Sequence, residues 1–129
     1  MAKRLFSLQE ARQVLPEVRD LATRMVTLSK ELKALQPVAK VLAQNNASNA
    51  GSAAGTVYVR YLMALQSQVQ KIQELGCLVK GVQQGLIDFP HLREGREVCL
   101  CWQVGEEDIG FWHEADSGFA GRTPLLDAD

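Results

Sequence analysis

The chain has 129 residues, of which 47% are apolar and 22% charged, and its net charge is −1. These values are typical of a single soluble globular domain with a modest core. The absence of a basic excess argues against nucleic acid and anionic membrane surfaces as partners, and we expect neither. No apolar run is long enough for a transmembrane helix or a secretory leader, and there are only three cysteines. We therefore expect a cytoplasmic protein without a disulfide framework.

A long amphipathic helix is predicted to begin at Ser7. Ser7 and Glu10 form a capping box, in which each side chain accepts a hydrogen bond from the backbone amide of the other residue. Pro16 lies within the helix and removes the hydrogen bond to the carbonyl of Arg12, so a kink is expected there, and Pro37 either ends the helix or kinks it again. Apolar residues recur at spacings of three and four, as in a coiled-coil seam: Leu8, Ala11, Leu15, Val18, Ala22 and Met25, then Leu28, Leu32, Leu35, Ala39 and Leu42.

A second helix is predicted after residues 44–55, which are small and polar and read as a loop. Thr56 is expected to cap this helix, and Gly76 is expected to end it in a left-handed conformation. The seam between them runs through Tyr58, Tyr61, Leu65, Val69 or Gln68, Ile72 and Leu75. The two helices are most simply an antiparallel hairpin over about residues 7–75.

The apolar pattern becomes strand-like after Gly76. Four short runs, at residues 77–80, 86–89, 97–102 and 109–113, are separated by glycines and by Pro90. The last two runs are expected to pair across a turn, with Trp102 opposite Ile109, and the tail is expected to be a loop. We therefore predict one α+β domain over residues 1–129, with the helical hairpin first and a small antiparallel sheet of three to four strands, with the tail, over about residues 77–129.

Five short motifs follow one another in the second half of the chain. They are Leu86-Ile87-Asp88-Phe89-Pro90, Leu100-Cys101-Trp102, Gly105-Glu106, Trp112-His113 and Gly118-Phe119-Ala120-Gly121-Arg122. Their order resembles an uncharacterised prokaryotic family catalogued as domain of unknown function 2203, and residues 6–11 followed by Leu15-Pro16 are similar to the start of that family. The resemblance covers nearly the whole chain. It implies a small bacterial cytoplasmic protein with no assigned activity.

Asp88, Glu106 and His113 lie within these motifs and are the candidate metal ligands. Two carboxylates and an imidazole can hold zinc, manganese or iron with positions left open. In the expected register, however, the turn that carries Glu106 lies about 13 Å or more from His113, at 3.3 Å per strand residue. A shared site then requires that turn to fold back or a second chain to contribute. The alternative is that Glu106 is a structural acceptor and His113 a core or interface histidine, so no cofactor is predicted.

Arg122 is the candidate anion-binding residue. Its planar guanidinium can hold a carboxylate or phosphate, and the neighbouring glycines would let backbone amides approach the anion. The alternative is an ion pair that ties the tail to Asp88 or Glu106. Cys99 and Cys101 share one strand face and are expected to be buried, unreactive thiols, whereas the expected register places His113 on the opposite face and disfavours a Cys–His pair.

The length of the first helix leads to a functional expectation. From residue 7 to residue 36 it would measure about 45 Å at 1.5 Å per residue, whereas a compact chain of this size is roughly 36 Å across. The helix therefore projects and needs a further partner. The leading hypothesis is a non-enzymatic interaction protein that forms a homodimer through its helices, with another protein partner or a larger assembly as variants. The second hypothesis is a metal- or anion-binding protein or enzyme that uses Asp88, Glu106, His113 and Arg122.

Overall fold

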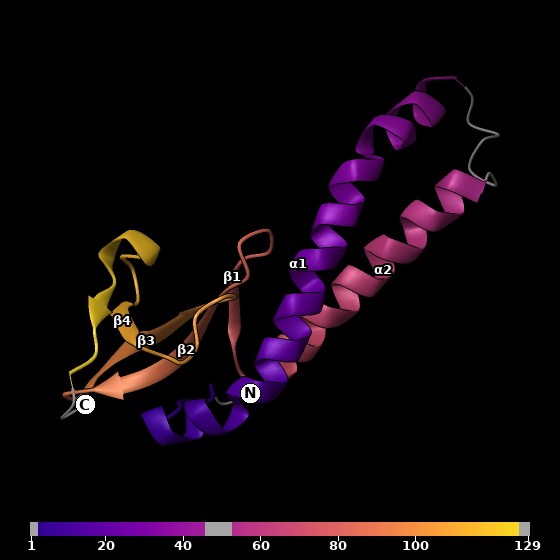
Figure 1. The fold of residues 1–129 in the computed structure, drawn as a ribbon. Coiled ribbons are helices and arrows are strands. Elements are labelled where there is room, and N and C mark those ends of the chain that lie inside the picture. The colour runs from indigo at the N-terminus through magenta and orange to yellow at the C-terminus, as the bar shows by residue number, and fades with distance from the viewer. Residues whose placement is uncertain (1–2, 46–52, 127–129) are drawn as a thin grey trace.

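The computed structural model describes residues 3–45 and 53–126 of the chain (Figure 1). The elements follow in the order α1 (Leu8–Asn45), α2 (Ala53–Glu74), β1 (Leu78–Gly81), β2 (Leu86–Arg93), β3 (Arg96–Gln103), β4 (Phe111–Glu114), the short 3₁₀ helix η2 (Phe119–Gly121) and β5 (Thr123–Pro124). The predicted α+β class is confirmed. The predicted strand number is wrong, because the antiparallel sheet has five strands rather than three to four. The additional strand, β5, has only two residues and is too short to leave an alternating pattern.

Helix α1 begins with the predicted capping box. The Glu10 amide donates to Ser7 Oγ at 3.0 Å, and the Ser7 amide donates to Glu10 Oε1 at 2.8 Å. The hydrogen bond from the Ser7 amide is the main reason that the pKa of Glu10 is lowered. Both Pro16 and Pro37 lie inside α1, so Pro37 does not end it. The first turns of the helix, dark indigo in Figure 1, run at a steep angle to the rest, as expected if Pro16 removes a hydrogen bond there.

The predicted loop at residues 44–55 falls largely outside the described residues. Its ends belong to the helices, since α1 continues to Asn45 and α2 already begins at Ala53. Thr56 is therefore within α2 and not its cap. The other end of α2 is as predicted, because Gly76 has φ 99° and its amide donates to the carbonyl of Gln73 at 2.9 Å.

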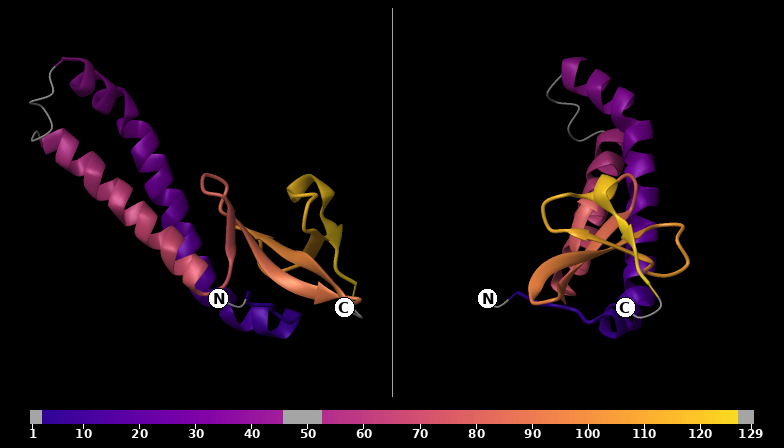
Figure 2. Two further views of the ribbon diagram at one scale, coloured as in Figure 1. Left: turned by 180° about the vertical axis from the view of Figure 1, so that it is seen from behind. Right: turned by 90° about the vertical axis from the view of Figure 1, so that its left-hand side faces the viewer.

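The two helices lie side by side, run in opposite directions and extend away from the sheet (Figures 1 and 2). We call α2 and the stretch of α1 beside it the helical arm. Most of the predicted seam of α1 is buried, at Ala11, Leu15, Val18, Ala22, Met25, Leu28 and Leu32. Leu8 and Leu35, near the two ends of the seam, are half-buried. No helix within the described residues has both the length and the apolar character needed to cross a membrane.

The five strands follow their sequence order across the sheet, β1-β2-β3-β4-β5. Between β3 and β4, Cys99 lies opposite His113 and Leu100 lies opposite Trp112. The predicted pairing of Trp102 with Ile109 is therefore wrong by one residue, since this register continues to Gly110. Ile109 lies before β4 and is fully buried in the core between helices and sheet. A shift of one residue moves every side chain of a strand to the opposite face, and His113 consequently shares a face with Cys99.

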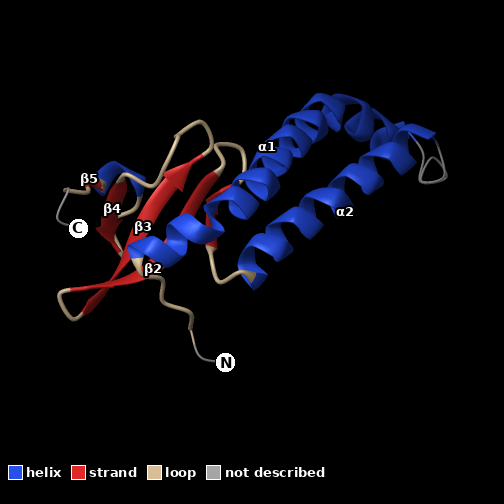
Figure 3. Ribbon diagram, turned by 60° about the horizontal axis from the view of Figure 1, so that its bottom comes forward, coloured by secondary structure: helices blue, strands red, loops and turns tan. Residues whose placement is uncertain are grey.

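The two faces of the sheet have different composition. One face, which we call the helix face, consists of Ile87, Phe89, Leu100 and Trp102, all fully buried against residues of α1 and α2. Figure 3 shows the first turns of α1 passing across these strands. The opposite face, which we call the tail face, carries Asp88, Cys99, Cys101 and His113. These four side chains are also buried, although they are a carboxylate, two thiols and an imidazole.

Pro90 lies in the middle of β2, where a proline is unusual because it cannot donate a hydrogen bond to a neighbouring strand. The pairing of β1 with β2 reaches only from Leu86 to Asp88, so β2 has β3 alone as a strand neighbour at Pro90. The missing amide is thus on an unpaired side of the strand. The Pro90 carbonyl accepts a hydrogen bond of 2.7 Å from the amide of Phe6, which attaches the segment before α1 to this edge.

Candidate metal centre

Three side chains from three neighbouring strands meet on the tail face. Asp88 of β2 lies directly opposite Cys101 of β3, and His113 of β4 lies opposite Cys99, the next residue of β3 on the same face. One ligand atom of each of Asp88, Cys101 and His113 lies within 4.8 Å of the other two. No other cluster of three such residues was found in residues 3–45 and 53–126. Asp88 is 1% exposed, Cys101 0% and His113 2%, so water is almost excluded from the cluster.

The hydrogen bonds of His113 define which ring nitrogen carries a proton. Nδ1 lies 2.7 Å from the carbonyl oxygen of Glu114. Since a carbonyl oxygen can only accept, Nδ1 carries the hydrogen and donates. In a neutral imidazole, Nε2 is then an acceptor with its lone pair directed at Asp88. Metal-binding histidines commonly have this arrangement, with one nitrogen bonded to a carbonyl and the other free for the ion.

His113 Nε2 faces the Asp88 carboxylate at close range. It lies 3.0 Å from Oδ1 and 3.0 Å from Oδ2. A neutral imidazole and an ionised carboxylate would thus place two acceptors against each other, so that either a proton or a cation must lie between them. Asp88 Oδ2 is buried and has no hydrogen-bond donor among the described residues, although the Cys101 thiol bonds to the same carboxylate. Leaving such an atom unpaired away from water costs free energy that a bound ion would recover.

Cys101 completes the cluster with a sulfur atom. Burial, followed by the charge of Asp88, raises the pKa of its thiol to about 12. The pKa of Cys99, the other cysteine of the tail face, is raised to about 11 for the same two reasons. Without a metal these groups are neutral thiols at physiological pH, and binding of an ion would release the Cys101 proton.

A cavity of about 330 Å³ gives access to this cluster. Asp88 and His113 form part of its wall, and the remaining residues come from β1, the start of β2 and the tail: Lys80, Leu86, Ala115, Asp116, Gly118 and Phe119. A smaller cavity of about 220 Å³ shares Lys80, Leu86 and Phe119 with it. The carboxylate and imidazole thus lie between the buried sulfur and a space large enough for a small molecule.

The structure does not bring Glu106 and Arg122 into the cluster. Arg122 Nη2 lies 2.8 Å from Glu106 Oε1, and the same guanidinium group stacks on Phe111 at 3.8 Å and on Phe119 at 4.6 Å. Glu106 Oε1 also accepts a hydrogen bond of 2.7 Å from the amide of Gln103. An ion pair of Arg122 with Asp88 or Glu106 was the predicted alternative to anion binding, and the structure has the pair with Glu106. It attaches the tail to the turn after β3.

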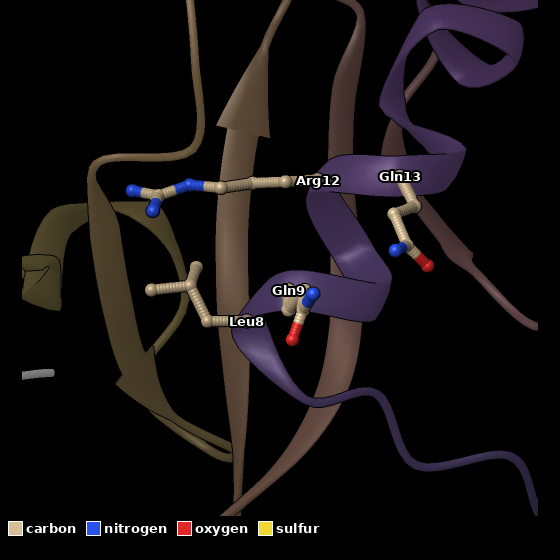
Figure 4. A pocket seen from close by; sticks show the side chains of 4 residues that line it. All are labelled: Leu8, Gln9, Arg12 and Gln13. Atoms are coloured by element: carbon tan, nitrogen blue, oxygen red, sulfur yellow. The ribbon is translucent and has the colours of Figure 1, made fainter.

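A further hollow, of about 460 Å³, lies at the first turns of α1 and is lined by Leu8, Gln9, Arg12 and Gln13 (Figure 4). Its single charged side chain is already engaged. Arg12 lies 3.3 Å from Asp108 Oδ2 and donates to the carbonyl of Ile109 at 3.1 Å. Its other polar side chains, Gln9 and Gln13, are exposed, so this hollow has no buried polar group without a partner and is not a comparable site.

The profile of a family described as an uncharacterized conserved protein, DUF2203, matches residues 4–125. The chain belongs to DUF2203. The family predicted from the sequence is therefore confirmed, and the match includes both helices as well as the whole cluster on the tail face. Comparison with curated proteins and with solved structures finds no match.

Cys101 is the member of the cluster that the sequence did not assign. It stands in the Leu100-Cys101-Trp102 motif, but the register of β3 and β4 decides whether it shares a face with His113. The expected register put the two on opposite faces. The alternation along the strand did show that Cys99 and Cys101 share a face. Only the correct pairing of β3 with β4 shows that His113 lies on that face as well.

Proposed function

We propose that this DUF2203 protein binds one divalent transition-metal ion through Asp88, Cys101 and His113. The observation that supports it most is the close approach of His113 Nε2 and the Asp88 carboxylate, in which two buried acceptors face each other. A metal ion satisfies both at once. The unpaired Asp88 Oδ2 and the adjacent Cys101 sulfur give the same ion further donors.

The combination of donors favours zinc. A thiolate sulfur is a soft ligand and an imidazole suits zinc or iron, whereas manganese prefers oxygen ligands. Three protein ligands leave the fourth position of a tetrahedral zinc ion for water or another molecule, which is the arrangement of reactive rather than purely structural zinc. The cavity beside Asp88 and His113 provides room for that fourth ligand.

Metal analysis of protein purified without chelators tests the proposal. We expect about one equivalent of zinc per chain, and a loss of at least tenfold in zinc affinity for His113→Ala and for Cys101→Ser. His91→Gln and Cys77→Ser are matched controls, because His91 bonds to the carbonyl of Phe6 and Cys77 belongs to the helix-side core. If the unsubstituted protein contains no stoichiometric metal and binds none when zinc is added, a shared proton joins Asp88 to His113 and the proposal is wrong.

A second candidate function is self-association through the helical arm. It is supported by three exposed apolar side chains of α2, of which Leu62 and Met63 lie about one turn after Val59: Val59 is 50% exposed, Leu62 37% and Met63 63%. An apolar surface of this kind on a projecting pair of helices is typical of an interface. We propose that a second copy of the chain covers it and forms a coiled-coil homodimer, as expected from the length of α1.

Light scattering at micromolar concentration tests this second candidate. We expect a mass of twice the 14.2 kDa chain for the unsubstituted protein and a monomer for the double variant Val59→Lys, Met63→Glu. Lys71→Glu, an exposed substitution at the other end of α2, is the control. A monomeric unsubstituted protein would remove the case for a homodimer.

We also propose a cytoplasmic location. The three cysteines are free and buried, in keeping with a reducing compartment.

A further inference from the structure

The wall of the cavity beside Asp88 and His113 combines one cation, one anion and an apolar surface. Lys80 of β1 supplies the cation, Asp116 the anion, and Leu86 with Phe119 most of the apolar surface. The Lys80 ammonium forms no hydrogen bond or ion pair with any residue in the described parts of the chain. Phe119 is 43% exposed, so its ring is available to a further group.

We propose that this cavity binds a small organic acid, whose carboxylate lies between the Lys80 ammonium and the open position of the metal. The inference rests on the proposed metal site and names the ligand that the site would take. The apolar part of the acid packs against Phe119 and Leu86, which separate the cavity from its smaller neighbour. A longer acid can extend into that neighbour, where Gln84 and Gln103 offer amide groups.

The charges of the site favour a singly charged ligand. The two positive charges of a bound ion are balanced by the carboxylate of Asp88 and the thiolate of Cys101, so Lys80 provides the remaining positive charge. Asp116 on the same wall repels additional negative charge. Phosphate carries between one and two negative charges at neutral pH, and its dianion is therefore disfavoured relative to a carboxylate.

The size of the cavity agrees with this class of ligand. Its volume of about 330 Å³ is at the lower end of the range for small-molecule sites. An aromatic acid such as benzoate fits the combination of one cation and an exposed phenyl ring. Benzoate is thus the probe, and inorganic phosphate is the comparison.

Cobalt-substituted protein provides the measurement, since the visible absorption of Co²⁺ changes when a ligand enters its coordination sphere. We expect a saturable change in the cobalt spectrum with benzoate and at least tenfold weaker binding of phosphate. Lys80→Ala should weaken benzoate at least tenfold and Lys80→Arg should retain most of the affinity. Asp116→Asn should tighten phosphate more than benzoate, and Lys71→Ala, an exposed lysine of α2, should change neither.

The outcomes separate this inference from the metal proposal. A protein that shows no cobalt absorption contradicts the metal site itself, and the inference with it. Normal cobalt absorption with no response to benzoate, or with the same response in Lys80→Ala, contradicts the organic acid alone. Phosphate binding as tight as benzoate would show that the site does not select a singly charged carboxylate, and would overturn the inference in that respect.

Discussion

The helix face and the tail face of the sheet are buried to almost the same degree but differ in chemistry. Ile87, Phe89, Leu100 and Trp102 on the helix face have no exposed surface, and Asp88 and His113 on the tail face are only 1% and 2% exposed. Burial of apolar side chains stabilises a fold, whereas burial of a carboxylate and an imidazole costs free energy unless both are fully paired. Adjacent residues of the same strands therefore serve different purposes, and burial by itself does not distinguish them.

The different chemistry of the two faces indicates that the stability of the fold and the proposed metal binding depend on different residues. The helix face joins the sheet to both helices in one apolar cluster, so its side chains are the main source of stability. The tail face contains an acceptor pair that is poorly satisfied by the protein alone. Substitutions on one face should change the free energy of unfolding, and substitutions on the other should change metal affinity.

The largest expected effect on stability is at Phe89. Its ring packs edge-on against Phe6 with centroids 5.4 Å apart and is fully buried. Phe89→Ala should lower the free energy of unfolding by about 3–5 kcal/mol, since it removes a large buried side chain and leaves a cavity. Urea denaturation measures the loss, and Phe89→Leu should cost clearly less. A tenfold loss of zinc affinity in the fraction of Phe89→Leu that stays folded would break the proposed separation of the two faces.

The tail face should respond in the opposite way, most clearly at Asp88. Asp88→Asn removes the negative charge and supplies an amide that can donate to His113 Nε2, so the metal-free protein should be as stable as the unsubstituted one or more stable. Zinc affinity should nevertheless fall at least tenfold. Chemical denaturation in the presence of a chelator and zinc titration measure the two quantities. Asp116→Asn, on the cavity wall, is the control that should keep zinc affinity. A large loss of stability in metal-free Asp88→Asn would indicate that Asp88 is a structural partner of His113.

The sequence predicted the helices well because their signals are local. The alternating spacing of Leu15, Val18 and Ala22, the capping box at Ser7 and the left-handed Gly76 depend on neighbours within a few residues, and all three features are present. The ends at Asn45 and Ala53 were misplaced by a few residues, since a run of small polar residues indicates a loop without fixing the residue at which each helix ends.

The candidate site was predicted only in part because it depends on register. Asp88 and His113 were named from their residue types, and the structure places them 3.0 Å apart. Cys101 was not, since the expected pairing was displaced by one residue. Ile109 leaves the strand to fill the core, and Arg12 of α1 holds its carbonyl. That packing is tertiary and has no counterpart in the alternation of β4.

A smaller effect is expected where the tail is attached to the sheet. Arg122 is half-buried, pairs with Glu106 and lies between Phe111 and Phe119. Arg122→Ala should lower the free energy of unfolding by about 1–3 kcal/mol, because it removes the ion pair of the partly buried Glu106 and the stacking on two rings. Arg122→Lys should recover little of this lost stability, since lysine lacks the planar group that stacks on both rings. Limited proteolysis of the tail and urea denaturation measure the effect.

Arg96→Ala is the matched control for this attachment. Arg96 pairs with Glu114 at 2.5 Å, but both side chains are largely exposed and the pair is screened by water. No measurable loss of stability is expected. Equal losses for Arg122→Ala and Arg96→Ala would argue that the tail is not held by the stacked guanidinium.

The smallest expected difference concerns the thiols of the two faces. Burial raises the pKa of Cys77 to about 12, as it does for Cys101, so both should react with iodoacetamide at pH 8 at least tenfold more slowly than in the urea-unfolded chain. Below these pKa values the thiolate fraction rises with pH, and alkylation should accelerate accordingly. Cys77 lies in the core between helices and sheet, so we expect it to be exposed only when that core opens. Cys101 lies on the other face, and Arg122 of the tail donates to its carbonyl at 3.4 Å, so we expect detachment of the short tail to expose it. Mass spectrometry of metal-free protein should therefore find Cys101 labelled before Cys77, and zinc should reverse that order, since a metal-bound thiolate is shielded from the reagent. Labelling of Cys77 first without zinc would show that the helix face is the one that opens more readily.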